Sequence, residues 1–263
     1  MVVEIGTSGW QYRDWAGVLY PGVPQRAWLE RYAETFGTVE VNNAFYRLPE
    51  RSTFAGWRQR TPADFMVAVK ANRYLTHIKR LAEPSEPVHR LMDRASALGE
   101  KLGPVLLQLP PTLRADHRLL ADCLAAFPRG TQVAVEPRHE SWWSTRVQDT
   151  LIEHGAALCW ADRRGRPVTP LWRTASWGYL RLHEGAAADH PRYGARALAR
   201  WAERIAQAWP AGTAWVYFNN DQHAAAIKDA LAFAAVAGRM GLETGRAGES
   251  TAPVGAASSR ARG

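Results

Sequence analysis

Apolar residues follow two alternating patterns along the chain, which predict eight strands separated by helices. The strand-like runs are short and rich in β-branched or aromatic residues, whereas the helix-like segments repeat apolar residues three and four positions apart. The predicted strands are Val2–Gly6, Thr38–Asn42, Phe65–Lys70, Val105–Leu109, Gln132–Glu136, Ala157–Asp162, Gly178–His183 and Trp215–Asn219. The predicted helices are Pro24–Phe36, Ser52–Arg60, Pro87–Leu102, His117–Phe127, Ser144–His154, Ala195–Trp209 and Gln222–Met240.

This alternation predicts an α/β protein built as a single TIM-type (β/α)8 barrel, with parallel strands inside and helices outside. Each parallel neighbour requires a crossover connection, and a barrel of this kind takes about 250 residues. We assign residues 1–242 to the barrel and interpret residues 243–263, which are rich in Gly, Ala, Ser and Arg, as a disordered C-terminal tail. A doubly wound open sheet is the alternative, but Gly6-Thr7-Ser8-Gly9-Trp10 lacks the third glycine of a dinucleotide-binding turn.

Side-chain alternation places polar residues on one side of most strands. In the second strand Val39 and Val41 share one side, and Glu40 and Asn42 share the other. In a barrel the aliphatic side meets the helices, so the polar side faces the interior. The polar residues also fall at the carboxyl ends of the strands, where barrel enzymes assemble their active sites. We therefore expect one functional site formed by Glu40, Asn42, Lys70, Gln108, Glu136, Arg138, Asp162, Arg181, His183 and Asn219, with Asn220 and Asp221 just beyond.

Composition adds little about partners. The net charge of +8 would suit a polyanion, but 29 of the 33 basic residues are Arg and no run of five cations occurs. Nucleic acid is therefore a secondary expectation. No apolar run is long enough for a membrane span, and the chain starts directly with a strand pattern, so we predict a cytoplasmic protein without a membrane partner. Cys123 and Cys159 have no metal-ligand spacing and are predicted to be buried thiols.

Several ordered motifs resemble the YecE-like family, also called domain of unknown function 72, over roughly residues 4 to 236. They are Gly6-Thr7-Ser8-Gly9-Trp10, Val39-Glu40-Val41-Asn42 with Phe45-Tyr46, Val69-Lys70, Thr76-His77, Leu107-Gln108-Leu109-Pro110-Pro111, Ala134-Val135-Glu136 with Arg138-His139 and Trp142, Arg181-Leu182-His183, and Phe218-Asn219-Asn220. The resemblance implies a β/α barrel but no settled reaction. The fold of this family has been compared in shape with metal-dependent nucleases of the endonuclease IV kind. That comparison is an analogy between folds and does not assign a reaction. Glu184 departs from the family pattern, which has Gly after the histidine, and adds a carboxylate beside His183.

Four residues are candidates for catalysis. Glu40 and Glu136 are a carboxylate pair for general acid and base work, with an interior ion network as the alternative. Lys70 could become a base or a Schiff-base amine through desolvation, or could simply pair with a carboxylate. His183 at a strand end can exchange protons near neutral pH, with a hydrogen-bonded structural role as the alternative.

The remaining candidates are assigned to substrate binding. The planar guanidinium groups of Arg138 and Arg181 can each donate paired hydrogen bonds to a carboxylate or phosphate, and we expect at least one of them to bind an anion. Three aromatic residues that follow strands, Trp10, Tyr46 and Trp142, could stack on a base or sugar, or else pack in the core. His77 could cap the site or make a local loop contact. Asn42, Gln108, Asp162, Asn219 and Asn220 complete the set, the amides as orienting hydrogen-bonding groups.

These residues predict an enzyme, with hydrolase or lyase chemistry favoured, that acts on a polar anionic small molecule such as a sugar or nucleotide derivative. The alternatives are a nucleic-acid binding or processing barrel of the endonuclease IV kind and a metabolite-binding sensor. We predict no cofactor and assign no metal ligand, with a single divalent ion as the alternative, because HxH and HExxH motifs are missing from the sequence. The sequence leaves the oligomeric state open.

Overall fold

The structure is a computed structural model that describes residues 1–248. Its strands are β1 Val2–Thr7, β2 Thr38–Val41, β3 Met66–Lys70, β4 Leu102–Gln108, β5 Val133–Glu136, β6 Ala157–Leu158, β7 Trp160–Arg163, β8 Arg166–Pro167, β9 Gly178–Leu182, β10 Thr213–Phe218 and β11 Glu243–Thr244. Its α-helices are α1 Trp28–Thr35, α2 Asn43–Tyr46, α3 Arg51–Gln59, α4 Ser85–Ala95, α5 His117–Ala125, α6 Thr145–Glu153, α7 Ala195–Ala208 and α8 Ala225–Arg239. Short 3₁₀ segments are η1 Arg13–Trp15, η2 Gln25–Ala27, η4 Ser96–Lys101, η5 Glu140–Trp142 and η6 Gln222–Ala224, and η3 Tyr74–Ile78 is a π-helix.

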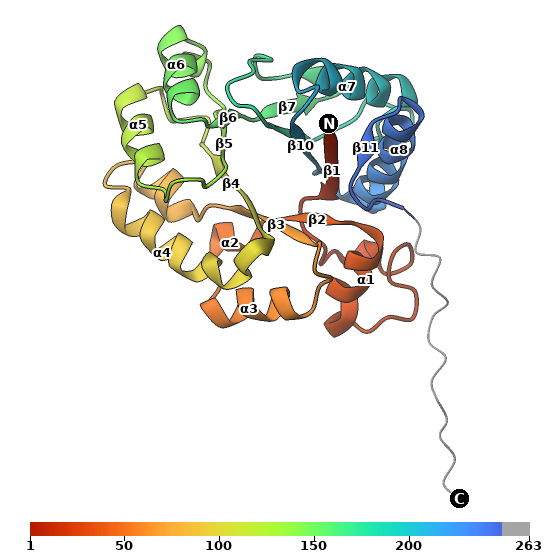
Figure 1. Cartoon of the computed structure of the whole chain (residues 1–263). Coiled ribbons are helices and arrows are strands. Elements are labelled where there is room, and N and C mark those ends of the chain that lie inside the picture. The colour runs from red at the N-terminus through yellow and green to blue at the C-terminus, as the bar shows by residue number, and fades with distance from the viewer. Residues whose placement is uncertain (249–263) are drawn as a thin grey trace, which may run out of the picture.

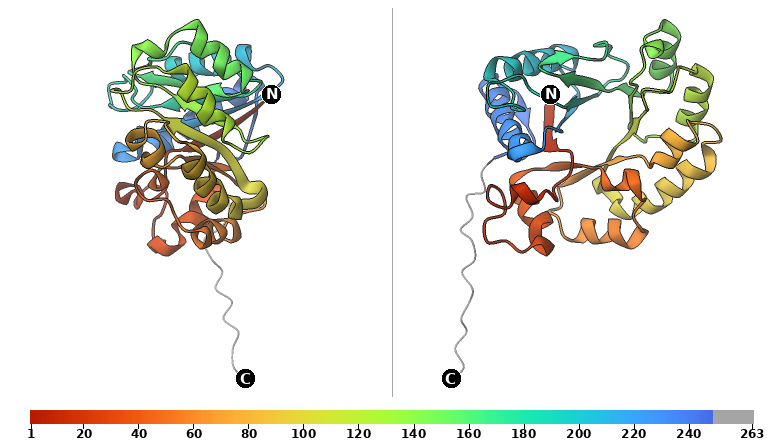
Figure 2. Two further views of the ribbon diagram at one scale, coloured as in Figure 1. Left: turned by 90° about the vertical axis from the view of Figure 1, so that its left-hand side faces the viewer. Right: turned by 180° about the vertical axis from the view of Figure 1, so that it is seen from behind.

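All eight predicted strands are present in this part of the chain, and the predicted helices overlap the observed ones. Figures 1 and 2 show the helices outside the strands, arranged around them in chain order. The pattern missed α2 and η3, which follow β2 and β3, because segments of four and five residues are too short to show a helical repeat.

The strands form two sheets. One has the order β11-β1-β10-β9-β7-β8 and the other β2-β3-β4-β5-β6. The ladders that join the main strands are parallel, with β7 and β8 the antiparallel exception. The sequence therefore predicted the parallel α/β class correctly.

A continuous closed barrel is not confirmed, because neither sheet closes within residues 1–248. β1 and β2 are linked by one isolated parallel bridge, between Ser8 and Glu40. At the other junction the predicted strand Ala157–Asp162 is interrupted at Cys159. Its first part pairs with β5 and its second part with β9, so this segment passes from one sheet to the other.

Two separate apolar clusters confirm the predicted alternation of side chains. The larger cluster lies between strands and helices and includes Val39, Val41, Leu180 and Leu182. The smaller cluster occupies the other side of the strands and consists of Ala68, Leu106, Ala134, Ala157, Cys159, Trp177, Tyr179, Trp215 and Tyr217. Small side chains such as alanine leave room on that side for the polar residues at the strand ends.

The C-terminal boundary differs from the one predicted. Glu243–Thr244 forms β11, which pairs with Val2 and Val3 of β1, and Gly248 N donates to the Thr35 carbonyl oxygen. The packed structure thus extends past residue 242, because β1 offers a free edge on this side. The rest of the predicted tail, residues 249–263, lies outside the described residues.

Two further predictions can be compared with the structure. Cys123 and Cys159 are buried free thiols, as predicted. Residues 1–248 contain no helix with the length and apolar character needed to cross a membrane.

Candidate functional site

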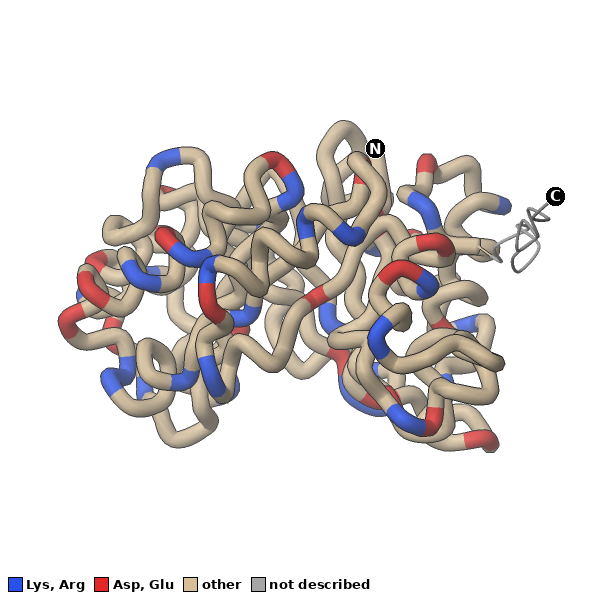
Figure 3. Tube along the Cα trace, turned by 90° about the horizontal axis from the view of Figure 1, so that it is seen from below, with Lys and Arg blue, Asp and Glu red and all other residues tan. Residues whose placement is uncertain are grey.

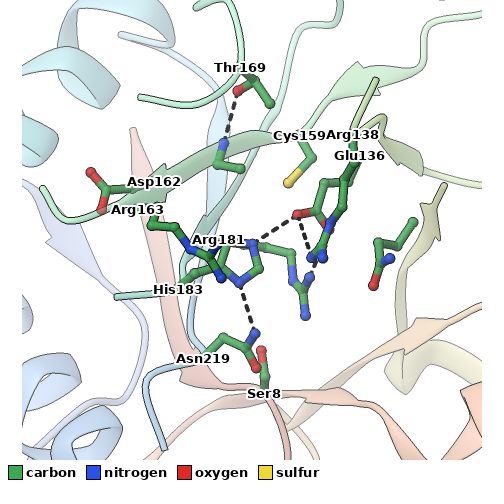
Figure 4. Close-up of polar contacts among 12 residues, drawn as sticks. Ser8, Glu136, Arg138, Cys159, Asp162, Arg163, Thr169, Arg181, His183 and Asn219 are labelled. Atoms are coloured by element: carbon green, nitrogen blue, oxygen red, sulfur yellow. Dashed lines mark hydrogen bonds and ion pairs between the residues drawn. The ribbon is translucent and has the colours of Figure 1, made fainter. Parts of the chain in front are cut away.

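Three predicted site residues meet at the carboxyl ends of β2, β5 and β9. The Arg181 guanidinium donates from Nη2 to Glu40 Oε1 at 2.8 Å and from Nη1 to Glu136 Oε2 at 2.7 Å. The side chains of all three residues are at most 2% exposed. Arg181 is therefore a buried bridge between two strands from one sheet and a strand of the other, and Figure 4 shows its contact with Glu136.

Glu40 has hydrogen-bond partners at both carboxylate oxygens. Besides Arg181, Ser8 Oγ donates to Oε1 at 2.8 Å and the Tyr179 hydroxyl donates to Oε2 at 2.6 Å. Burial opposes ionisation of Glu40, but the charge of Arg181 and these hydrogen bonds outweigh it and lower the pKa. Glu40 is therefore an ionised, fully hydrogen-bonded carboxylate.

Both carboxylate oxygens of Glu136 also have partners. His183 Nε2 lies 2.8 Å and Arg138 Nη2 3.3 Å from its Oε1, and Arg181 holds Oε2. Burial opposes ionisation, yet Arg181 and His183 bring the pKa of Glu136 well below its ordinary value. Both carboxylates thus lie in the interior ion network that the sequence offered as the alternative to catalysis.

His183 has a defined tautomer in this arrangement. Asn219 Nδ2 lies 2.9 Å from Nδ1, so the amide donates to that nitrogen and Nε2 carries the proton directed at Glu136. Burial, partly offset by Glu136, lowers the pKa of His183, which favours the neutral ring at neutral pH. The imidazole therefore links Glu136 to Asn219, as Figure 4 shows.

Lys70 lies at the end of β3 and its side chain is buried. Its Nζ donates to Gln108 Oε1 at 2.6 Å and lies 4.2 Å from the centre of the Phe45 ring. Burial and the nearby positive charge of Arg181 lower the pKa of Lys70 to about 8. A substantial fraction of this amine is therefore neutral at mildly alkaline pH.

A cavity of about 540 Å³ lies beside this network. Its lining comprises Glu136, Pro137, Arg138, Glu140, Trp143, Ala161, Arg163, Val168, Thr169, His183 and Asn219. The side chains of Arg138 and Arg163 are 40% and 68% exposed. A second cavity of about 350 Å³ adjoins it, since Arg163, His183 and Asn219 line both.

Not every predicted residue faces this region. Asp162 accepts hydrogen bonds from the Tyr193 hydroxyl at 2.6 Å and from Trp201 Nε1 at 2.8 Å, so its carboxylate lies on the helix side. The reason is alternation, because Asp162 shares its side with Leu158 and Trp160 of the large cluster.

Two of the aromatic candidates also lie elsewhere. Trp10 is 4% exposed and packs edge-on against Trp57, and Trp142 is 1% exposed with its Nε1 bonded to the Leu113 carbonyl. Both tryptophans therefore pack in the core, which was the alternative to stacking on a base or sugar. Tyr46 is 75% exposed and contacts the Phe45 ring edge-on.

The remaining candidates make local contacts. The His77 ring lies 4.9 Å from that of Phe45, and its Nδ1 contacts the Thr76 hydroxyl. Asn220 donates to the Pro191 carbonyl and to Asp229, which fixes the segment after β9. Asn42 Oδ1 is buried without a hydrogen-bond partner among residues 1–248.

Four residues near the network were not assigned a site role from the sequence. Tyr179 and Ser8 bind Glu40, and Tyr179 lies two residues before Arg181 and so on the same side of its strand. Arg163 lines both cavities, but it is the exposed last residue of β7 and lies one position beyond the predicted strand, so the sequence pattern gave no signal for it. The extra carboxylate of Glu184 contacts Arg163, Arg164 and His190, so it affects the charge at the edge of the second cavity.

Within the described part of the chain, no three His, Cys, Asp or Glu side chains are grouped to hold a metal ion. The neighbouring Arg181 and Arg138 also use the oxygen atoms of Glu40 and Glu136 that would serve as ligands.

The fold and the site define an α/β protein with parallel sheets and a buried, arginine-centred ion network at the strand ends. The chain belongs to the family described as Protein of unknown function DUF72, whose model matches residues 4–253. The resemblance noted from the sequence motifs is thereby confirmed.

Curated relatives of known sequence support this membership. UPF0759 protein YecE of Escherichia coli (strain K12) is 27% identical over 155 residues, which are 59% of this chain and 55% of YecE. UPF0759 protein YunF of Bacillus subtilis (strain 168) is 24% identical over 167 residues, 60% of this chain and 58% of YunF. The match thus spans little more than half the length of these curated relatives.

Solved structures extend the similarity to most of the chain. The crystal structure of a DUF72 family protein from Thermotoga maritima MSB8 has a TM-score of 0.78 at 26% identity and covers 89% of this chain and 98% of its own. One from Enterococcus faecalis V583 has a TM-score of 0.76 at 19% identity, with coverage of 90% and 95%, and supports the fold alone.

Proposed function

We propose that this protein is an enzyme that binds a small anionic molecule at the carboxyl ends of its strands and acts on it by acid–base chemistry. The proposal treats the two sheets as the wall of one (β/α)8 barrel. It is supported by the Ser8–Glu40 bridge and by the Ala157–Asp162 segment, whose two parts pair with β5 and with β9. A cytoplasmic location, predicted from the sequence, is part of the proposal.

One observation carries it: the ionic groups accessible from the cavity are mainly cationic, whereas the network carboxylates are buried and already paired. Arg138 and Arg163 expose much of their side chains, and Glu40 and Glu136 expose almost none. Glu140 is the carboxylate at the rim of the larger cavity. A ligand carboxylate or phosphate would therefore meet two guanidinium groups with free donors.

The buried network has a supporting part in this proposal. Arg181 holds Glu136, and Glu136 holds the Nε2 proton of His183, so the imidazole is fixed in one orientation at the cavity wall. A ligand hydroxyl could replace the Asn219 amide at Nδ1, where His183 would act as a proton acceptor. Lys70, with its pKa lowered to about 8, is a second candidate base.

Surface features favour a small molecule over a nucleic acid. Trp10 and Trp142, two of the three aromatic residues expected to stack on bases, are buried. In Figure 3, which shows the trace from below, the positions of Lys and Arg are interspersed with those of Asp and Glu. A basic groove that follows a phosphate backbone would need cations clustered along one face.

The proposal can be tested by thermal denaturation with a panel of sugar phosphates, nucleotides and dicarboxylates, combined with native mass spectrometry. A ligand at a concentration of 100 Kd stabilises by about 2.7 kcal/mol, which raises Tm by about 5 to 11 °C for a chain of this size. Arg138→Gln should abolish the shift. Arg129→Gln, at an exposed arginine before β5, is the matched control and should retain it. The proposal fails if no compound shifts Tm, or if both variants respond alike.

A further inference from the structure

Asp221 lies three residues after the end of β10 and lines the second cavity together with His183, Asn219 and Asn220. Its backbone is held in place, because Trp15 Nε1 donates to the Asp221 carbonyl at 3.2 Å. Three residues later, Ala224 N donates to Asp14 Oδ2 at 3.3 Å, which fixes the start of α8. The backbone that carries this carboxyl is therefore held at Asp221 itself and at Ala224.

The side chain of Asp221 lacks the structural role that its position suggests. It is the N-cap residue of η6, where an aspartate ordinarily accepts a backbone N–H, yet it makes no capping hydrogen bond. Its Oδ1 is buried without a partner among the described residues. An unsatisfied buried carboxyl oxygen is costly, so its presence beside a cavity requires another explanation.

The surroundings of Asp221 favour its protonated form. Burial, together with the nearby charges of Glu40 and Asp14, raises the pKa of Asp221 to about 7, although the Tyr12 hydroxyl as a hydrogen-bond donor and the positive charge of Arg181 act to lower it. The neighbouring Tyr12 stays un-ionised, because burial and the charge of Asp221 raise the pKa of its phenol. Unlike Glu40 and Glu136, whose pKa values are lowered, Asp221 can gain or lose a proton near neutral pH.

We propose that Asp221 is a further proton-exchanging residue of the candidate site and acts on a hydroxyl or ether oxygen of a hydroxylated anion. The proposal rests on the proposed function, since the anionic group of the ligand is held by Arg138 and Arg163. The two cavities share Arg163, His183 and Asn219, so a ligand bound at the arginines reaches the second cavity without crossing the buried network. There Asn219 and Gln222 supply neutral hydrogen-bonding groups that suit sugar hydroxyls.

The chemical step is a proton transfer that conserves charge. The neutral carboxylic acid donates its proton to the oxygen of a leaving group as the bond between that oxygen and carbon breaks, and the carboxylate remains. A water molecule supplies the electron pair of the new bond to that carbon, and the neutral ring of His183 accepts the proton that the water loses. In the reverse direction, the carboxylate accepts a proton from a hydroxyl group and returns to the acid. Either transfer requires a pKa near the working pH, which burial supplies here.

The first test needs no ligand. Infrared titration of the whole protein should show the band of a protonated carboxyl that disappears with a midpoint near pH 7, and Asp221→Asn should lack this band. The isosteric variant preserves shape and removes the charge, so we expect it to fold, with circular dichroism as the check. A carboxyl band that is the same in Asp221→Asn would overturn the proposal.

The second test uses sulfate, an anion that does not titrate near pH 7. Isothermal titration calorimetry in two buffers of different ionisation enthalpy measures proton uptake on binding. Wild type should take up as much as about half a proton at pH 7, because a bound anion raises the pKa of a half-protonated neighbour further. Asp221→Asn should bind sulfate within about threefold of wild type but without this uptake.

The two possible failures can be told apart. Absence of sulfate binding to wild type contradicts the proposed function. Binding accompanied by the same proton uptake in wild type and Asp221→Asn contradicts the assignment of Asp221 alone. Once a substrate is found in the compound panel, turnover by Asp221→Asn should fall by about 100-fold or more, within the range typical of a lost general acid or base. Wild-type turnover in this variant would overturn the proposal.

Discussion

Replacement of Arg181 by methionine should destabilise the protein strongly, because it leaves two buried carboxylates without their shared partner. Methionine retains much of the length and apolar contact of the arginine side chain but removes the hydrogen bonds of 2.8 Å to Glu40 and 2.7 Å to Glu136. Removal of one partner from a buried ion pair typically costs about 3 to 5 kcal/mol. We expect a loss of this size at pH 7.5.

The loss should depend on pH in a direction that the pKa values determine. In wild type Glu40 and Glu136 have lowered pKa values, so their contribution to stability is present above the ordinary glutamate pKa and constant between pH 5.5 and 7.5. Without Arg181 the pKa values rise, and protonation of a folded carboxyl then stabilises the variant as the pH falls. If one carboxyl titrates across these two pH units, the variant regains up to about 2.7 kcal/mol of its free energy of unfolding between pH 7.5 and pH 5.5.

Urea denaturation followed by tryptophan fluorescence at pH 7.5 and pH 5.5 measures both effects, and the 12 tryptophans of the chain give the signal. Arg138→Gln is the matched control, because Arg138 has a 40% exposed side chain and one contact of 3.3 Å to Glu136, and should cost below about 1 kcal/mol. Adding Glu40→Gln and Glu136→Gln to Arg181→Met should restore much of the stability. A loss below about 1 kcal/mol, or one independent of pH, would refute this view of the network.

Three further predictions concern residues around the site. Asp162→Asn should lower the free energy of unfolding, measured by urea denaturation, by about 1 to 3 kcal/mol, because the amide is a weaker acceptor for the hydrogen bonds from Tyr193 and Trp201. Its sulfate affinity should stay unchanged, and weaker sulfate binding would contradict the position of Asp162 on the helix side. Gly6→Ala should lower Tm, at a cost of about 1 to 3 kcal/mol, since the new Cβ would lie 2.2 Å from the Thr38 carbonyl oxygen; an unchanged Tm would show that β1 and β2 can separate freely. After reductive methylation, the NMR signal of Lys70 should titrate with a midpoint near 8, and a midpoint near 10.5 would show that its amine is solvated.

Much of the candidate site could be predicted from strand alternation alone. Glu40, Glu136 and Arg181 were placed on one side of their strands because successive residues point in opposite directions, and the structure brings all three into contact. The same rule, applied to the sixth predicted strand, would have placed Asp162 with Leu158 and Trp160 on the helix side. Trp10 and Trp142 could not be distinguished from rim residues, because burial of a loop aromatic depends on which helix covers it.

The amino-acid sequence by itself determined the order of strands and helices and the inward or outward direction of most strand residues, since both depend on local periodicity. Only the tertiary structure decided how these residues act on one another. It united Glu40, Glu136 and Arg181 in one network and passed the Ala157–Asp162 segment from one sheet to the other. It also left the buried Oδ1 of Asp221 without a hydrogen-bond partner among residues 1–248. These outcomes depend on distances between residues far apart in the chain, and burial and charge pairing at such distances set which groups stay ionised.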